Sequence, residues 1–335
     1  MPNIREVSRI ARVSTATVSR ALRQPQLVSQ ATRERVLRAV EKSGYRPNLL
    51  ARNFSAGRSF TVVVLVPDIT NPFFSRVIRG IEQEAQTMGY SVLLGDTQGT
   101  PGREQEYASL ALTNQADGLI QLHGRYPFAE KDIALAAAVP MVNACERIGN
   151  ECAYPVIELD NRGAAQVLTQ HLLRLGHRRL GVITGPATSP LVQDRLAGFQ
   201  QSLEAANITM DHSLVAEGDF SMPSGQKAAT LLLGQKTPPT ALFCMNDEMA
   251  IGAMHQCKNL GLRVPEDISV AGFDGIEFSS FTDPPLTTIK QPAEELGRQA
   301  MTSLYRIMTG RLLDNHQVKL PFELVARDST GPASQ

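Results

Sequence analysis

Residues 13–22, VSTATVSRAL, place two serines, two threonines and one arginine in a stretch that is predicted to be helical. Ser and Thr are mediocre helix formers, so their presence needs another explanation. Short hydroxyl and methyl side chains let a helix approach base edges in the DNA major groove. Thr15 and Ala16 can contact thymine methyl groups. Thr17 and Ser19 can bind phosphate oxygens, and Arg20 can donate hydrogen bonds to guanine or phosphate.

Helix signals around this stretch divide residues 1–46 into three short helices, the pattern of a helix-turn-helix domain. The predicted N-caps are Asn3, Ser14 and Ser29, and Gly44 ends the third helix. The third helix is expected to turn Val36, Leu37 and Val40 inward. The alternative from the residues alone is an ordinary three-helix bundle with a polar surface.

Basic residues are concentrated in the same part of the chain. Residues 1–60 carry twelve Lys or Arg against three Glu, a net charge of +9, which leaves −9 for residues 61–335. A solvated face is the plain explanation of a charge run. The asymmetry favours a polyanionic partner, and we expect double-stranded DNA.

From Phe60 onward, apolar runs of strand length alternate with helical patterns. Strands are expected at 61–66, 91–95, 118–122, 140–144, 156–159, 179–184, 213–218, 240–245 and 268–273, and helices at 72–88, 103–114, 128–138, 163–175, 191–206, 222–234 and 247–260. This alternation indicates parallel sheets covered by helices on both faces. The predicted fold is therefore an N-terminal three-helix helix-turn-helix domain plus an α/β core of two doubly wound parallel-sheet subdomains.

Polar and aromatic residues follow these strands, at the sheet edge where ligands bind in such folds. We expect the cleft to be lined by Phe73, Phe74, Tyr126, Asp160, Arg195, Phe220, Asn246 and Asp274. Arg195 and Asp274 would face each other across it and hold the hydroxyls of a ring, on which the phenylalanines stack. Two alternatives remain open. One of Phe73 and Phe74 could be core, since helix neighbours point about 100° apart, and Asp160 could be a helix cap.

The N-terminal residues resemble a known family. IREVSRIARVSTATVSRAL, VSQATRERV and GYRPNLLAR look like the signature of the lactose/galactose-repressor (LacI/GalR) family, and the resemblance continues along nearly the whole chain. It implies that Thr15, Ala16 and Arg20 read bases and that Thr17 and Ser19 hold phosphates. The segment RPNLLARNFSAG (46–57) resembles the family hinge, which becomes a helix when two subunits meet on DNA and wedge its minor groove. The DNA contacts expected there are Asn48, Arg52 and Phe54, with Phe54 in place of the usual Leu.

The resemblance extends to the effector site. RLAGF (195–199), GFD (272–274) and CMNDEMAIGAM (244–254) match motifs that hold the effector through Arg195, Asp274 and Asn246. NPFFSRVIRGIE matches the segment that supplies stacking aromatics in purine-binding members. The stretches GP..SPL..DRLAGF, GDF and FTDPPLTTI.QP look closest to cytidine-responsive members, so we expect a nucleoside such as cytidine. A sugar or sugar acid is the alternative. Ser189, also placed in the site, stands where some members have a second ligand-binding Arg.

The family fold, which resembles periplasmic sugar-binding proteins, implies the domain boundaries. They are a helix-turn-helix domain at 1–46, a hinge at 47–59, and an effector-binding and dimerisation core at 60–335. Within the core, the N-subdomain comprises about 60–160 and 292–321, and the C-subdomain about 161–291 and 322–335. A helix at 293–309 and strands near 317–320 and 322–327 would return the chain to each subdomain in turn.

The usual enzyme signatures are missing from the sequence. It has no GxGxxG after a strand, no P-loop, no GxSxG and no HExxH, so we expect no catalytic residue, metal or cofactor. The four cysteines form no CxxC pair, and we expect them to be buried thiols. They are Cys145, Cys152, Cys244 and Cys257. Neither a signal peptide nor a run of about 18 apolar residues is found, so we expect a cytoplasmic protein without a membrane partner.

The resulting hypothesis is a homodimeric transcription repressor of a catabolic operon that reads a palindromic operator and senses a small-molecule effector. Fewer than ten residues follow Arg327, too few for a tetramer-forming heptad tail. A sugar- or nucleoside-binding protein without DNA activity is the alternative from another class. Whether the effector weakens or strengthens DNA binding stays open.

Overall fold

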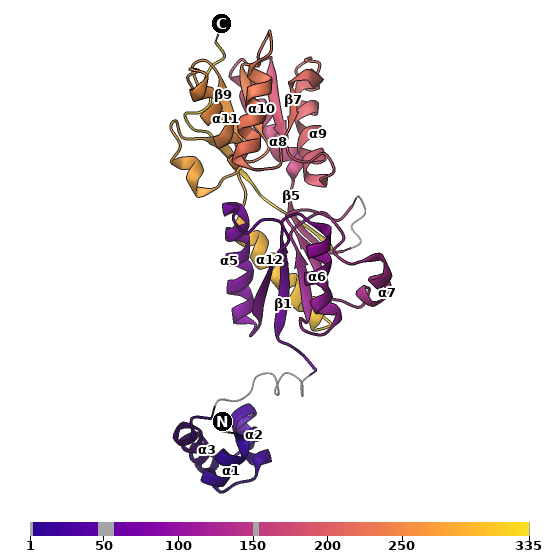
Figure 1. The fold of residues 1–335 in the computed structure, drawn as a ribbon, viewed down its shortest axis with the longest axis vertical. Helices are drawn as coiled ribbons and strands as arrows, with labels where there is room; N and C mark the ends of the chain where they lie inside the picture. Colours follow the sequence, from indigo (N-terminus) through magenta and orange to yellow (C-terminus); the bar gives the residue numbers. More distant parts are fainter. Residues whose placement is uncertain (1–2, 46–56, 150–153, 335) are drawn as a thin grey trace. The chain divides into compact units, whose positions relative to one another are not determined.

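The computed structural model describes residues 3–45, 57–149 and 154–334. The chain separates into two compact units, Met1–Ser59 and Phe60–Gln335, drawn in Figure 1. Asn48, Arg52 and Phe54, the predicted hinge contacts, lie outside the described residues, as does Cys152.

The N-terminal unit contains the three predicted helices, α1 (Ile4–Ala11), α2 (Thr15–Arg23) and α3 (Gln30–Ser43), with a 3-10 turn η1 (Pro25–Leu27) before α3. Asn3 Oδ1 accepts hydrogen bonds from the backbone N–H groups of Arg5 and Glu6, and Ser14 Oγ accepts one from Thr17. These bonds satisfy N–H groups that have no partner within the helix. Gly44 ends α3 in the left-handed conformation, as predicted.

Two expectations for α3 were wrong. Leu37 is 45% exposed, because the buried side of the helix passes through Val36 and Ala39 instead. Ser29 does not cap the helix with its side chain, because its hydroxyl donates to Thr32 Oγ1. The small core of this unit consists of Val7, Ala11, Val18, Ala21, Val36 and Ala39.

The first sheet of the second unit, which we call the N-subdomain sheet, has six strands that all pair in parallel. In spatial order they are β11 (Gln317–Leu320), β5 (Val156–Leu159), β4 (Met141–Ala144), β3 (Gly118–Gln121), β1 (Thr61–Val66) and β2 (Ser91–Asp96). Its helices are α5 (Pro72–Thr87), α6 (Pro101–Leu112), α7 (Ile133–Ala136) and α12 (Ala293–Met308). Apolar clusters on both faces bury β1 completely from Val62 to Val66.

The second sheet, the C-subdomain sheet, is parallel except for its last strand. Its order is β12 (Glu323–Val325), β10 (Thr287–Lys290), β9 (Ser269–Asp274), β8 (Ala241–Cys244), β6 (Leu180–Thr184) and β7 (Val215–Glu217), with β12 antiparallel to β10. Its helices are α8 (Asn161–Arg174), α9 (Pro190–Ala205), α10 (Met222–Leu233) and α11 (Asp247–Asn259). The chain passes between the sheets after β5, after β10 and between β11 and β12 (Figure 1).

The α/β alternation predicted from the apolar runs is confirmed, with local differences. The helix expected at 128–138 consists of a 3-10 turn, η2 (Glu130–Asp132), and the single turn of α7. A 3-10 turn, η3 (His212–Leu214), shortens β7, because Asp211 accepts from the Ser213 N–H and hydroxyl and bends the chain there. Strand β10 was not expected as a separate strand.

Two histidines fix the C-terminal segment onto the C-subdomain. His177 is 2% exposed; its Nδ1 lies 3.0 Å from Thr240 Oγ1, and its Nε2 lies 3.0 Å from Ser269 Oγ and 3.1 Å from the Gly331 carbonyl oxygen. His171 Nε2 lies 2.9 Å from the hydroxyl of Thr330. Burial lowers the pKa of both histidines below the usual value, because it disfavours the charged imidazolium.

This arrangement predicts that the protein is less stable in mild acid. Below a pH of about 6.5 the unfolded histidines bind protons that the folded ones resist, so the free energy of unfolding should fall as the pH is lowered from 7.5 to 5.5. His177→Ala should cost about 1–3 kcal/mol, because it removes the interior hydrogen bonds of the imidazole to Thr240, Ser269 and Gly331, and should flatten the pH dependence. Urea unfolding followed by circular dichroism measures both. His255→Ala, at an exposed position on α11, is the control, and an unchanged pH slope in His177→Ala would contradict the assignment.

Candidate DNA-reading helix and effector cavity

Helix α2 presents the predicted DNA-reading side chains on its outer surface. Thr15, Ala16 and Arg20 are exposed, and Thr17 and Ser19 are half-buried. Val18, which is fully buried, and Ala21 anchor the opposite face in the core of the N-terminal unit. The Thr17 hydroxyl lies 2.9 Å from Ser14 Oγ, so the N-cap also orients this side chain. The helix therefore presents small hydroxyl and methyl groups and one guanidinium on the surface available to a partner.

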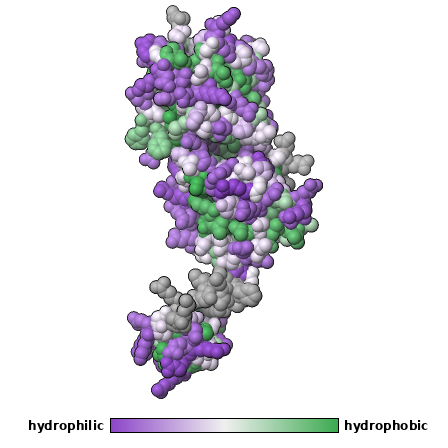
Figure 2. Space-filling model, in the orientation of Figure 1, coloured by the Kyte–Doolittle hydropathy of each residue, from purple (hydrophilic) through white to green (hydrophobic). Residues whose placement is uncertain are grey.

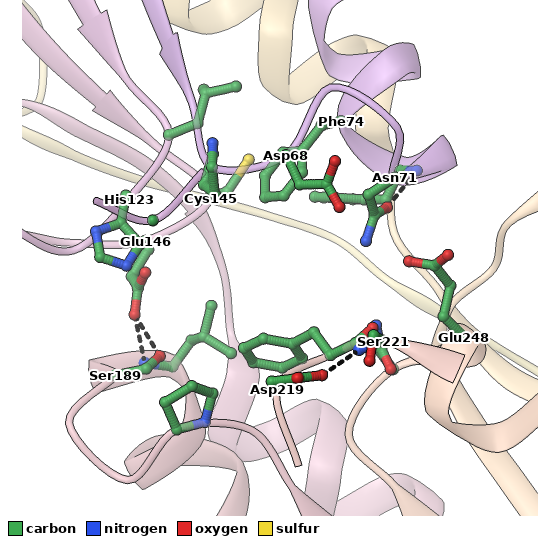
Figure 3. A pocket seen from close by; sticks show the side chains of 18 of the residues that line it. Asp68, Asn71, Phe74, His123, Cys145, Glu146, Ser189, Asp219, Ser221 and Glu248 are labelled. Carbon is green, nitrogen blue, oxygen red and sulfur yellow. Dashed lines mark hydrogen bonds between the residues drawn. The ribbon is translucent and has the colours of Figure 1, made fainter. Parts of the chain in front are cut away.

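A cavity of about 1080 Å³ lies between the two sheets of the core (Figure 3). Its lining residues follow the carboxyl ends of β1, β2, β3 and β4 on one side and of β6, β7, β8 and β9 on the other. Parallel strands bring these ends to one edge of each sheet, and the chain crossings place the two edges opposite each other. Of the predicted effector residues, those that line the cavity are Phe73, Phe74, Ser189, Arg195, Phe220, Asn246 and Asp274.

Both phenylalanines of the first turn of α5 line the cavity, and one of them also packs in the core, which was the alternative left open. Phe73 is 6% exposed and also belongs to the core of the N-subdomain, whereas Phe74 is half-buried. Their rings meet edge to face, with centroids 5.4 Å apart. Asn71 caps the helix by accepting from the Phe73 N–H at 2.9 Å, and Pro72 occupies the first helical position. The N-terminus of α5, which carries both phenylalanines, is thus fixed by its cap and its proline.

Arg195 and Asp274 do not face each other across the cleft, which corrects the prediction. Both belong to the C-subdomain, Arg195 on α9 and Asp274 at the end of β9, with guanidinium Nη2 3.9 Å from carboxylate Oδ1. They are 3% and 8% exposed. The guanidinium also donates to Asn161 Oδ1 at 2.9 Å and to the Met245 carbonyl oxygen, and it lies over the Phe273 ring. The pair therefore lies buried in the C-subdomain side of the cavity.

Burial shifts the pKa values of this pair in opposite directions. It lowers the pKa of Arg195 to about 10, against the opposing effect of Asp274, and raises the pKa of Asp274 to about 6. Asp274 also has a positive φ of 112°, a conformation that side-chain-bearing residues rarely adopt. Gln291 Nε2 donates to its Oδ1 at 2.6 Å. A strained, buried carboxylate at a cavity wall is typical of a ligand-binding group.

Phe220 and Asn246 are held together at the C-subdomain wall. Asn246 caps α11 by accepting from the Met249 N–H at 2.9 Å, and its Nδ2 donates to the Phe220 carbonyl oxygen at 2.8 Å. The Phe220 ring lies against Gly185, where an added Cβ would come within 2.1 Å of the ring. Only glycine at 185 leaves room for the ring in this position.

Two predicted effector residues lie elsewhere. Tyr126 stacks on Tyr154 at 5.8 Å and contacts Phe128, so it packs with the apolar cluster near α6 instead of lining the cavity. Asp160 accepts from the Gly163 N–H at 3.2 Å and caps α8 at the crossing from β5. The cap was the alternative that the sequence left open, and the side chain is not among the cavity-lining residues.

The prediction missed several residues that complete the cavity. Glu146 follows β4 and is 4% exposed; its Oε1 accepts from the Ser189 hydroxyl at 2.5 Å, across the boundary between the subdomains (Figure 3). Glu248 on α11 and Gln291 after β10 also line it. The strand-end rule that selected the other residues applies equally to Glu146 and could have found it. Nothing in the local sequence distinguishes Gln291, because β10 itself was not expected.

Within the described ranges, no helix is long and apolar enough to cross a membrane. The same part of the chain contains no group of three or more His, Cys, Asp or Glu side chains arranged to hold a metal ion.

Comparisons with known proteins match both parts of the chain. Residues 3–48 match bacterial regulatory proteins of the lacI family, and residues 169–330 match the periplasmic binding protein-like domain. The HTH-type transcriptional repressor CytR of Escherichia coli (strain K12) is 44% identical over 327 residues, 98% of this chain and 96% of that protein. The ribose operon repressor of Haemophilus influenzae is 34% identical over 91% of each chain.

A solved structure agrees over the same length. The lac repressor dimer bound to operator and the anti-inducer ONPF has a TM-score of 0.86 and 31% identity, covering 98% of this chain and 99% of that one. Full-length relatives and both matched regions lead to one conclusion: this chain belongs to the lacI family of bacterial regulatory proteins.

Proposed function

We propose that this chain is a homodimeric, cytoplasmic transcription repressor that reads a palindromic operator with α2 and binds a nucleoside such as cytidine in the core cavity. The observation that carries the proposal is the aromatic and charged lining of that cavity, in a chain that also presents α2 for DNA. A catabolic operon is the expected target, since its genes are needed only when the nucleoside is present.

The cavity offers separate partners for the two halves of a nucleoside. Arg195 and Asp274 supply a donor and an acceptor for ribose hydroxyls, and both are buried and fixed in place. Phe74 from the N-subdomain and Phe220 from the C-subdomain provide ring faces for a planar base. A base held between rings from both subdomains would favour one relative arrangement of the subdomains and thereby couple ligand to DNA affinity.

Exposed apolar side chains of the core support the homodimer. Leu93 and Leu94 on the edge strand β2 are 38% and 43% exposed. Phe278 and Phe281, in and just after the 3-10 turn η4 (Glu277–Ser280), are 56% and 79% exposed. In Figure 2 this loop forms a pale green area on the largely hydrophilic C-subdomain surface. Exposed apolar patches mark protein interfaces, so we assign the dimer contacts to these side chains.

Arg20→Ala should abolish operator binding and leave effector affinity unchanged, because the side chain lies on the exposed face of α2. Loss of one bidentate base contact costs about 1–3 kcal/mol per subunit. The probe is a palindromic duplex selected from random sequence by the wild-type protein, and affinity is measured by fluorescence anisotropy. Arg174→Ala, an equal charge change on the exposed end of α8, is the control. Equal loss in both variants would contradict the assignment of α2.

The nucleoside assignment is tested by the melting temperature in the presence of cytidine, adenosine, free bases, ribose, hexoses and sugar acids. A ligand at 100 times its dissociation constant adds about 2.7 kcal/mol to stability. Cytidine or adenosine should raise the melting temperature and ribose should not. A shift with a sugar alone would overturn the nucleoside and leave the repressor.

Effector binding should weaken as the pH falls from 7.5 to 5.5, because Asp274, whose pKa is raised to about 6, accepts hydrogen bonds from ligand hydroxyls best when ionised. Asp274→Asn should lower the affinity for cytidine at least about tenfold, as expected for a lost charge-assisted hydrogen bond, and reduce this pH dependence to the part that comes from Glu248, whose pKa is raised to about 7. Operator binding without effector should persist. Calorimetry measures the affinities, with Asp328→Asn, at an exposed site, as the control. A pH dependence in Asp274→Asn as large as that of the wild type would contradict the role given to this carboxylate.

A further inference from the structure

The effector cavity carries a marked excess of negative charge. The carboxylates that line it are Asp68, Asp96, Glu146, Asp219, Glu248 and Asp274. The cationic side chains that line it are Arg125 and Arg195, with His123 as a third basic group. The lining acids therefore outnumber the lining arginines by four.

Both arginines already have carboxylate partners. Arg195 Nη2 lies 3.9 Å from Asp274 Oδ1. Arg125 Nη1 lies 3.5 Å from Glu104 Oε2, which is 1% exposed, and donates to the Gly99 carbonyl oxygen at 3.2 Å. His123 Nδ1 lies 3.3 Å from the other oxygen of Glu104. The basic side chains that line the cavity thus already interact with carboxylates of the protein.

The remaining acids are held by neutral donors. Glu146 accepts from the Gly124 N–H at 2.8 Å and from the Ser189 hydroxyl. Asp68 accepts from the N–H and hydroxyl of Thr70, and Asp219 from the Ser221 N–H. Asp96 accepts from Gln98 Nε2 at 3.1 Å. Among the described residues, no Lys or Arg forms an ion pair with any of these four or with Glu248.

These acids surround the ligand space from both subdomains. Figure 3 shows Glu146 and His123 at one end of the cavity and Glu248 at the other, with Asp68 between them on the N-subdomain side and Asp219 along the C-subdomain side. Glu146 is only 4% exposed, so water and salt screen its charge poorly. A ligand that enters this space meets an acidic wall at each end.

We propose that the cavity selects an uncharged effector and rejects its phosphorylated or carboxylated counterparts, with Glu146 and Glu248 as the residues that determine this specificity. For the nucleoside, the inference rests on the proposed function. It also disfavours a sugar acid as the alternative effector. Each carboxylate oxygen has two lone pairs and can accept a further hydrogen bond from a hydroxyl or amino group of a neutral ligand, whereas an ionised phosphate can only accept.

This selectivity indicates which classes of reaction form and consume the effector. The effector would be supplied by hydrolysis of a phosphomonoester or by uptake of the unphosphorylated compound. A kinase that phosphorylates it would remove the signal. The repressor would therefore respond to the unphosphorylated compound and ignore the phosphorylated pool of the same compound.

The first test compares three ligands by calorimetry with the full-length wild-type protein: cytidine, cytidine 5′-monophosphate and the neutral 5′-dimethyl phosphate ester of cytidine. At an effective dielectric constant of about 20, one unpaired carboxylate about 8 Å from a phosphate charge weakens binding about 30-fold. We expect the monophosphate to bind at least about 30-fold more weakly than cytidine, and the neutral ester to bind within a few-fold of cytidine. Equal affinity for cytidine and its monophosphate would overturn the proposal. Equal loss for both esters would also overturn it, because bulk and not charge would then be rejected.

The second test removes the charges one at a time. Glu146→Gln and Glu248→Gln should each reduce the ratio of cytidine to monophosphate affinity by up to about 30-fold, the effect of one carboxylate about 8 Å from the phosphate. The measurement is made at pH 8, because burial, with Asp68 and Asp274 nearby, raises the pKa of Glu248 to about 7. Glu266→Gln, an equal charge change at an exposed site after α11, is the control. A ratio unchanged in both cavity variants would overturn the roles of the two residues.

Failure of the nucleoside assignment would be seen separately. If cytidine and adenosine do not bind but a neutral sugar does, the same comparison is made between that sugar and its phosphate ester. Rejection of the ester would then uphold the charge selection while the nucleoside is discarded. Equal binding of the sugar and its ester would overturn the charge selection.

Discussion

The buried guanidinium of Arg195 fixes the geometry of the cavity that we propose as the effector site. A buried cation is tolerated only where its donors and its charge are matched, and here the partners come from three different elements. Asn161 is the first residue of α8, Met245 follows β8, and Asp274 ends β9, while Arg195 itself lies on α9. One side chain thus joins the carboxyl end of the C-subdomain sheet to the helices that cover it.

The same pair explains the strained backbone next to it. Asp274 keeps a positive φ because Arg195, Gln291 and the chain beyond β9 hold it from several sides. Asp247, which is fully buried, accepts from the Ile276 N–H and the Thr288 hydroxyl and ties that loop to β10. The folded protein already holds Asp274 in its strained conformation and keeps both charges buried without a ligand. The cavity is therefore preorganised for binding.

Local sequence signals predicted most elements because apolar runs and caps are local properties. Asn3, Ser14 and Gly44 marked helix ends that the structure confirms, and the strand ends located the cavity. Contacts between distant segments were not predictable in this way. Tyr126 was misplaced because its partner Tyr154 lies on another loop, and the Arg195–Asp274 pair was assigned to opposite walls because periodicity does not say which subdomain supplies which wall. The hinge residues Asn48, Arg52 and Phe54, outside the described ranges, remain predictions.

The link between Glu146 and Ser189 has a mechanical consequence. Nη1 of the next residue, Arg147, lies 2.5 Å from Asp194 Oδ2. Two successive residues of the N-subdomain therefore bind the N-cap and the second turn of α9, the helix that carries Arg195. Away from this contact, the like charges of Asp68 and Glu248 repel across the same boundary. A hydrogen bond and an ion pair thus hold the two subdomains together beside α9, whereas like charges oppose their contact at Asp68 and Glu248. The attraction between the subdomains is therefore uneven along the cavity, strong beside α9 and weak beside the two acids.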